Sequence, residues 1–179
     1  MQALLRLARV IDALNDRLGT AANAMVLAAC LLCAANAAFR YAFDLSSNAW
    51  LEIQWYLFAG VVMLGASHTL RRNEHVRVDI VYMHLSARGK LWLDLAGALV
   101  FLVPSMLAIA WLAWPFFLQS WQVQEASTNA GGLIRWPVKL LLPLGFTLVA
   151  LQGLSEAIKR AAALHGDASL DTRYERPVQ

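Results

Sequence analysis

Residues 95–124 read LAGALVFLVPSMLAIAWLAWPFFLQSWQVQ, a stretch without a single Asp, Glu, Lys or Arg. Water does not dissolve such a stretch as a surface helix, whereas roughly 20 residues of apolar helix suffice to cross the core of a bilayer. At about 1.5 Å per residue the stretch is longer than that core, so it must tilt, kink at Pro104 or Pro115, or emerge from the membrane. We therefore predict a membrane span here.

Three further runs without charge lie at residues 18–39, 53–70 and 140–155. Together the four runs predict an all-α integral membrane protein with spans at about residues 18–40, 49–70, 93–120 and 136–158. Residues 1–160 then form one transmembrane domain, and residues 161–179 a polar cytoplasmic tail. Only 15% of the chain is charged, against about 25% in soluble domains. No loop is long enough to bury a core, which excludes a soluble catalytic domain.

Two segments outside the spans have the pattern of amphipathic helices that lie in the membrane interface. The first carries apolar residues at helical spacing, with Arg6 and Arg9 on its other faces: Leu4, Leu7, Ile11, Leu14 and Leu18. A helical extension of the first span is the alternative for this segment. The second follows the second span and repeats apolar residues in the same way: Val78, Val81, Tyr82 and Leu85.

The distribution of positive charge predicts the orientation. Of the 15 Lys and Arg residues, twelve lie in the N-terminal segment, the loop after the second span and the C-terminal tail, and three lie on the other side. By the positive-inside rule both termini are cytoplasmic. Phospholipids are expected partners of the flanking residues, with arginines on the cytoplasmic side and tryptophans at the opposite interface: Arg6, Arg9, Arg71, Arg72, Trp111, Trp114 and Trp121.

Few residues in or beside the spans could carry chemistry. Glu52 lies in the first turn of the second span, and Arg40 closes the first span only a short turn away, so the two could pair. Such a pair could be a substrate or ion ligand, or a clamp or subunit contact. His68 could ligate haem only with His75 or His84, which lie in the following loop. Cys30 and Cys33 are expected to be packing residues, because lipid-buried thiols are not activated as thiolates.

A set of spaced residues resembles a known family over roughly residues 5–160. In the first half these are Asn36, Phe39-Arg40-Tyr41, Trp50, Glu52, Gly65-Ala66 and the run RNEHVRVD at 72–79. They are similar to the small permease subunit, DctQ-like, of tripartite ATP-independent periplasmic (TRAP) transporters. Residues of the second half resemble the branch for mannitol, chloroaromatic or 2-oxo acid uptake: Ser120-Trp121, Glu125-Ala126-Ser127, Asn129, Gly131-Gly132, Trp136-Pro137, Lys139, Leu144-Gly145-Phe146, Gln152-Gly153 and Ser155-Glu156.

The resemblance implies a non-enzymatic scaffold in the inner membrane of a bacterium. It would hold a large, sodium-coupled, elevator-type permease, to which a periplasmic binding protein delivers an organic acid. The candidate structural and subunit-contact residues are Arg40, Trp50, Glu52, Gly65, His75 and Asp79. The candidate residues for docking the binding protein are Glu125, Asn129, Arg135 and Lys139. No catalytic residue, cofactor, metal or nucleic acid is expected.

Two other functions fit a four-span chain less well. A self-contained small multidrug exporter would carry a Glu deep in its first span, where this chain has no carboxylate. A membrane anchor for a haem or quinone enzyme would need paired histidines within the membrane, and the second span supplies only His68. The chain also lacks the internal repeat that self-sufficient secondary transporters commonly have.

Overall fold

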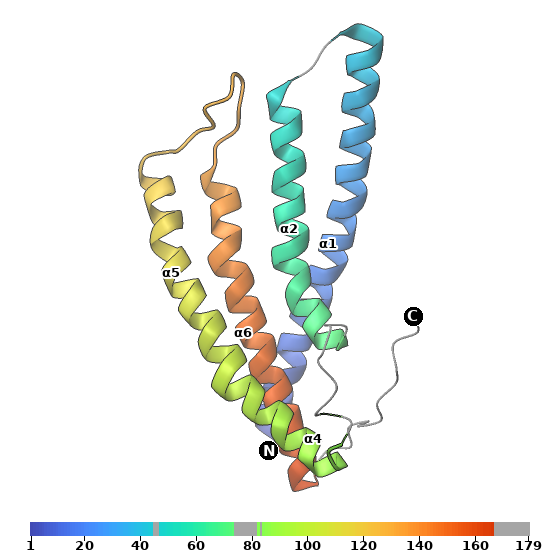
Figure 1. Cartoon of the computed structure of the whole chain (residues 1–179), viewed down its shortest axis with the longest axis vertical. Coiled ribbons are helices and arrows are strands. Elements are labelled where there is room, and N and C mark those ends of the chain that lie inside the picture. The colour runs from blue at the N-terminus through green and yellow to red at the C-terminus, as the bar shows by residue number, and fades with distance from the viewer. Residues whose placement is uncertain (45–46, 74–81, 83, 167–179) are drawn as a thin grey trace.

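The computed structural model describes residues 1–44, 47–73, 82 and 84–166. The elements are α1 (Gln2–Phe43), α2 (Asn48–Arg72), α4 (Ala87–Ala96), the π-helical segment η1 (Gly97–Leu102), α5 (Val103–Gln122) and α6 (Trp136–His165) (Figure 1). Four helical segments are long and apolar enough to cross a membrane, namely Gln2–Phe43, Asn48–Arg72, Ala87–Gln122 and Trp136–His165. The prediction of an all-α membrane protein is confirmed.

The N-terminal segment continues the first span and is not a separate interfacial helix. α1 runs without a break from Gln2 to Phe43, so the alternative of a helical extension is the one that the structure adopts. The physical reason is burial: Ala8, Ile11 and Asn15 are covered by other helices of the chain instead of facing lipid. Most of the second expected interfacial helix, with His75 and Asp79, lies outside the described residues.

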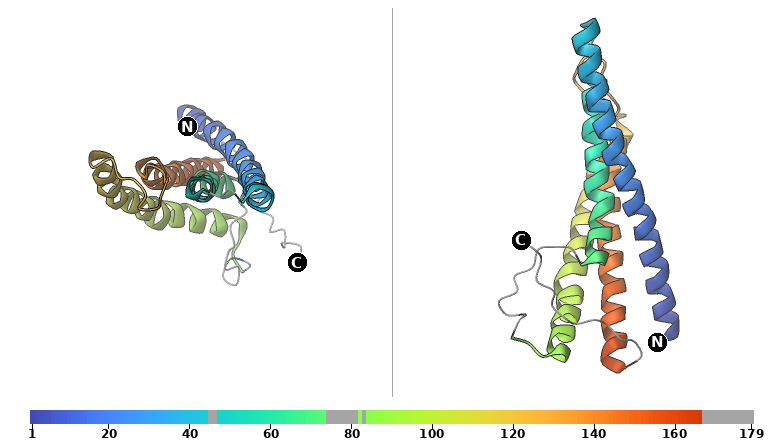
Figure 2. Two further views of the ribbon diagram at one scale, coloured as in Figure 1. Left: turned by 90° about the horizontal axis from the view of Figure 1, so that it is seen from above. Right: turned by 90° about the vertical axis from the view of Figure 1, so that its right-hand side faces the viewer.

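α6 is the central helix of the fold. It packs against α1, α2, α4, η1 and α5, whereas α5 packs mainly against α6 and η1. Viewed from above, α1 and the α4–α5 path lie on opposite sides of α2 and α6 (Figure 2). Small residues let the helices approach: a Cβ on Gly145 would lie 2.8 Å from Met63 Cβ, and one on Gly153 2.8 Å from Leu102 Cδ2.

The third span is a continuous helical path with a π-helical segment before Pro104. Proline lacks an N–H and clashes with the carbonyl four residues earlier in a regular α-helix, and the wider π-helical turn at Gly97–Leu102 accommodates it. The Ser105 hydroxyl donates to the Phe101 carbonyl within the same region. Nearly all of the long charge-free run therefore lies in one helical segment, which extends from Ala87 to Gln122.

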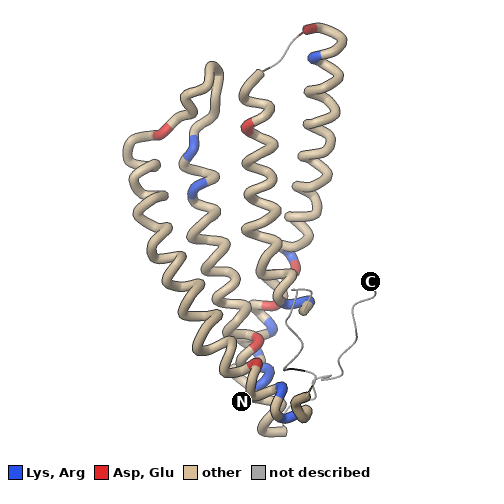
Figure 3. The backbone as a smooth tube through the Cα atoms, in the orientation of Figure 1, with Lys and Arg blue, Asp and Glu red and all other residues tan. Residues whose placement is uncertain are grey.

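Charged residues gather at the two ends of the molecule (Figure 3). We call the end with the α1–α2 connection and the α5–α6 loop the loop end, and the end with the first turns of α1 and the last turns of α6 the termini end. Between them the outer surface is apolar, with Phe101 71% and Trp111 78% exposed. Such a surface is suited to lipid. α6 continues to His165, beyond the expected end of its span.

Candidate functional site

The α5–α6 loop, residues 123–135, folds back on itself at the loop end. The Ser127 amide donates to the Leu133 carbonyl (2.9 Å) and the Arg135 amide to the Glu125 carbonyl (2.8 Å). Gly132 is required here because a Cβ at this position would lie 2.4 Å from Ser127 Cβ. The loop is thus a compact body with its own backbone hydrogen bonds.

Glu52 attaches this loop to α2. Its side chain lies in the first turns of α2, and the residue is 4% exposed. Oε1 accepts hydrogen bonds from the Ser127 hydroxyl and from Asn129 Nδ2 (2.9 Å), and Oε2 accepts one from the Leu133 amide (2.6 Å). Three donors to one carboxylate make a strong, charge-assisted connection.

Two further contacts join the same pair of segments. Asn48 Nδ2 donates to the Ala130 carbonyl (3.1 Å) and the Tyr56 hydroxyl to the Ile134 carbonyl (3.1 Å). With Glu52 they give three anchor points on α2 for the loop. The two halves of the chain are therefore connected at the loop end.

The predicted pair between Arg40 and Glu52 is wrong. The oxygens of Glu52 are occupied by the loop, and Arg40 makes no hydrogen bond or ion pair with any residue that the structure describes. The reason is that the loop brings three donors to Glu52 from far along the sequence. Trp50, another candidate contact, packs edge-on against Phe39, with ring centroids 5.6 Å apart. Gly65 lies against α1, where its Cβ would meet Ala22 Cβ at 3.8 Å.

A second carboxylate, Glu125, organises the positive charges of the loop end. Lys139 Nζ donates to Glu125 Oε2, and Arg135 Nη1 lies 3.7 Å from Oε1. The hydrogen bond from Lys139 is the main reason that the pKa of Glu125 is lowered from its ordinary value. The Lys139 ammonium also lies 4.0 Å from the centroid of the Phe116 ring. A cation near an aromatic face gains further stabilisation.

The predicted docking residues thus have partners within the chain. Asn129 is bound to Glu52, and Glu125, Arg135 and Lys139 form one charge cluster. The Arg135 side chain remains 40% exposed, and the residues at the tip of the loop, Thr128, Ala130 and Gly131, are exposed as well. A partner approaching the loop end would therefore meet Arg135 and the loop tip.

Aromatic rings surround the outer part of α5. Trp121 packs edge-on against Trp136 of α6, with centroids 4.4 Å apart, and Phe117 lies between Trp114 and Trp121. Trp111, Trp114 and Trp121 are all exposed on the outer surface. Their positions suit rings at the membrane interface, the role that the sequence predicts for them.

A buried polar cluster joins α1 to α6 at the termini end. Asn15 and Gln152 are both 0% exposed, and Asn15 Nδ2 donates to Gln152 Oε1 (2.6 Å). Gln152 Nε2 donates in turn to Asp12 Oδ1 (2.9 Å) and to Glu156 Oε1 (3.0 Å). The Ser155 hydroxyl donates to Asp12 Oδ1 (2.8 Å). A continuous network of this kind fixes the relative position of two helices.

Ion pairs extend this cluster to α2 and α4. Arg71 of α2 pairs with Asp12 and Asp16 of α1, and His68 Nδ1 lies 3.3 Å from Asp16 Oδ1. On the other side of α6, Arg160 Nε donates to Asp94 Oδ2 of α4 (3.0 Å) and Nη1 to Glu156. We call these residues the termini-end cluster: Asp12, Asn15, Asp16, His68, Arg71, Asp94, Gln152, Ser155, Glu156, Lys159 and Arg160.

The termini-end cluster includes two residues that the sequence analysis singled out, Arg71 and His68. Arg71, expected as a lipid anchor, forms ion pairs within the protein, whereas Arg6, Arg9 and Arg72 are exposed. His68 lies beside Asp16 and over Gly19, where a Cβ would be 2.4 Å from the ring. Within the described residues, no group of three or more His, Cys, Asp or Glu is placed to hold a metal ion.

The sequence matches the model of one known protein family. The model of the DctQ component of tripartite ATP-independent periplasmic transporters matches residues 29–163. The chain belongs to this family. The matched range contains the described helices except the first part of α1 and the last two residues of α6. No curated protein and no solved structure matches the chain.

The DctQ family consists of the small permease component of TRAP transporters, so this chain is a component of a transporter. TRAP systems combine this component with a large permease and a periplasmic binding protein. The match includes Glu52, the whole α5–α6 loop and the α6 part of the termini-end cluster. The part of that cluster contributed by α1 precedes the matched range.

Proposed function

We propose that this DctQ component is the stationary scaffold of a sodium-coupled TRAP transporter that imports an organic acid or a related solute, as does the branch for mannitol, chloroaromatic or 2-oxo acid uptake that the chain resembles. The observation that carries the proposal is the attachment of the helices to one another at both ends. Glu52 joins the α5–α6 loop to α2, and Gln152 joins α6 to α1. A chain whose helices are connected at both ends is suited to support a large permease that moves beside it.

The distribution of polar groups supports the same role. Charges lie at the two ends and the stretches between them carry none (Figure 3). A protein that carries an ion or an acid across the bilayer needs polar or charged groups near the midplane. We assign the sodium site, the substrate site and the elevator movement to the large permease.

The positive-inside rule supports an orientation with the termini end in the cytoplasm of a bacterium and the loop end in the periplasm. Labelling of intact cells with a membrane-impermeant maleimide tests it, in a background with Cys30→Ala and Cys33→Ala. Thr128→Cys should react and Arg88→Cys should react only after the membrane is opened. The opposite pattern would contradict the proposed orientation.

The loop end then faces the binding protein. The partly exposed Arg135 and the loop tip beside it offer a polar rim, and charges on such a rim tune the rate of encounter more than the final affinity. The same loop could instead pack on loops of the large permease. The effect of binding-protein concentration on transport separates the two arrangements, as described in the Discussion.

Reconstitution tests the proposal as a whole. Proteoliposomes with a sodium gradient should take up the organic acid only when the large permease, the binding protein and this chain are all present. This chain alone should give no uptake, because it lacks the sites that the proposal assigns to the large permease. Uptake by this chain without partners, or full uptake by the large permease and binding protein without it, would contradict the proposal.

A further inference from the structure

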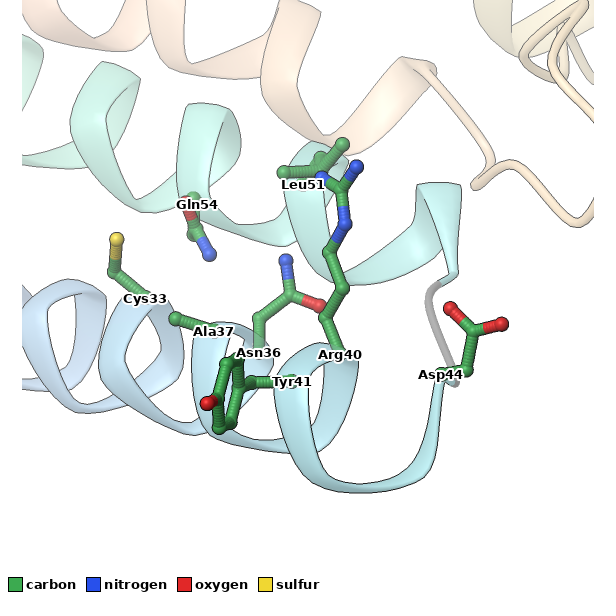
Figure 4. Close-up of a pocket in the computed structure, with 8 residues that line it drawn as sticks. All are labelled: Cys33, Asn36, Ala37, Arg40, Tyr41, Asp44, Leu51 and Gln54. Carbon is green, nitrogen blue, oxygen red and sulfur yellow. The ribbon is translucent and has the colours of Figure 1, made fainter.

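A groove between α1 and α2 at the loop end takes no part in the contacts described above. It has a volume of about 560 Å³ and is lined by Cys33, Asn36, Ala37, Arg40, Tyr41, Asp44, Leu51 and Gln54 (Figure 4). Glu52 points away from it, into the α5–α6 loop. The groove is therefore separate from the charge clusters described above.

Two hydrogen-bond donors in the groove lack a partner. Of the three cations at the loop end, Arg135 and Lys139 pair with Glu125, whereas Arg40 has no partner among the described residues. Gln54 Nε2 is buried and likewise makes no hydrogen bond to any residue that the structure describes. A buried amide donor without an acceptor is costly, so Gln54 indicates a ligand that carries an acceptor. Arg40 is exposed and offers an unpaired positive charge to an anionic group of the same ligand.

The polarity of the groove changes along its length. Arg40 lies at the outer end of the span, Asn36 one turn deeper, and Cys33 about one further turn into the apolar region. Figure 4 shows the Asn36 and Gln54 amides directed into the same space, with Arg40 nearer the rim. A matching ligand has an anionic group at the rim, neutral acceptors one turn below and an apolar chain beneath them.

We propose that this groove binds one glycerophospholipid. Arg40 holds the phosphate, the Asn36 and Gln54 amides donate to the ester carbonyls, and an acyl chain lies along Ala37 and Cys33. Each part of the lipid then meets a group of matching polarity at the depth where the bilayer itself places that part. The inference concerns a site that the proposed scaffold function does not require.

Asp44 sets the preference of the groove for one lipid headgroup over another. Its carboxylate lies at the rim beyond Arg40, where it lines the groove and is exposed (Figure 4). A free anion at this place disfavours an anionic headgroup and favours an ammonium beside the phosphate. The groove should therefore prefer phosphatidylethanolamine to phosphatidylglycerol.

Native mass spectrometry of the purified full chain tests the proposal. Delipidated protein in detergent is given an equimolar mixture of phosphatidylethanolamine and phosphatidylglycerol. We expect one tightly retained lipid, mainly phosphatidylethanolamine. Arg40→Gln should lower its retention about tenfold, because a charge-assisted hydrogen bond is lost. Gln54→Leu should also lower retention, and Arg40→Lys, which keeps the charge, should retain more lipid than Arg40→Gln.

The same assay includes a control variant at the opposite end of the molecule. Arg88→Gln removes an exposed cation at the termini end and should retain the lipid like the wild type. Asp44→Asn should bind the two lipids about equally. Unchanged retention by both Arg40→Gln and Gln54→Leu would overturn the proposal. It would also be overturned if Arg40→Gln kept the lipid but no longer co-purified with the large permease, because the groove would then be a protein contact.

Discussion

Glu52 Oε2 accepts a hydrogen bond from the Leu133 amide at 2.6 Å, although the two residues are 81 positions apart in the sequence. This contact, with those from Ser127 and Asn129 to Oε1, attaches the beginning of α2 to the end of the α5–α6 loop. One carboxylate of the first half of the chain therefore supplies three of the hydrogen bonds that hold the second half at the loop end.

Glu52→Gln should lower the melting temperature of the purified chain by several degrees. The amide has one acceptor atom instead of two, and its NH₂ group faces a donor from the loop. Ser127→Ala should have a smaller effect in the same direction, and Thr128→Ala, at an exposed neighbouring position, should have none. In the complete transporter, Glu52→Gln should reduce assembly more than substrate affinity. A selective change in sodium or substrate affinity with intact assembly would make Glu52 a ligand.

The fold could largely be predicted from the sequence because partition into lipid is a local property. Each charge-free run is close to the length that crosses the bilayer, and each lies wholly or almost wholly within one of the four long helical segments. Whether the N-terminal segment forms a separate interfacial helix or continues the first span could not be predicted in the same way. Leu4, Leu7 and Leu14 are exposed as expected of an interfacial helix, but Ala8, Ile11 and Asn15 are buried against the rest of the protein.

The partners of Glu52 could not be predicted, since they depend on the path of a loop more than 70 positions away. Arg40 was the nearest cation in the sequence, but the loop supplies neutral donors. The termini-end cluster, by contrast, leaves a signal. Gln152, Ser155, Glu156 and Lys159 follow one another at spacings of three, one and three. This is one polar face on an otherwise apolar helix, and Asp12 and Asp16 repeat four apart on α1.

Gln152→Leu should destabilise the chain by about 1–3 kcal/mol, because the buried Asn15 amide and the Asp12 carboxylate each lose a partner. The double variant Asn15→Leu with Gln152→Leu should lose less than the sum of the single variants, since both partners of one buried hydrogen bond are then apolar. Gln119→Leu, at an exposed position of α5, is the matched control. Chemical denaturation in detergent measures the wild type, the two single variants, the double variant and the control. Additive effects would show that the two amides do not interact.

The ion pair of Glu125 should make stability depend on pH in the acid range. The pKa of Glu125 is lowered from its ordinary value of 4.5, chiefly by the hydrogen bond from Lys139. A lowered pKa in the folded state stabilises the protein above the unfolded pKa, and this contribution is lost as the pH falls through the folded pKa. The melting temperatures of the wild type and Glu125→Gln should therefore differ most near neutral pH and converge below about pH 4.5.

Lys139→Met is the complementary variant for this pH experiment. It removes the main cause of the lowered pKa, so the acid-dependent part of the stability should shrink, while the fold keeps the apolar stem of the side chain. If the gap between the wild type and Glu125→Gln were the same at every pH, the pair would contribute nothing through its charge.

Arg135→Glu tests whether the loop end docks the binding protein. The reversed charge lies on an exposed rim and should slow the encounter, so transport should fall while the membrane complex still purifies intact. A higher concentration of binding protein should restore part of the rate, and higher salt should reduce the difference between variant and wild type. Transport that is unaffected at every concentration of binding protein would show that this surface does not take part in docking.

The rigidity that the proposed scaffold requires is tested most directly by a distance measured across the chain during transport. Spin labels at Thr128→Cys and Arg88→Cys, with Cys30 and Cys33 replaced by alanine, report the separation of the loop end from the termini end in the assembled complex. Pulsed electron–electron double resonance is recorded in three states: without sodium, with sodium, and with sodium, substrate and binding protein. A rigid scaffold gives the same distance distribution in all three states. A shift approaching one helical turn, about 5 Å, would contradict it.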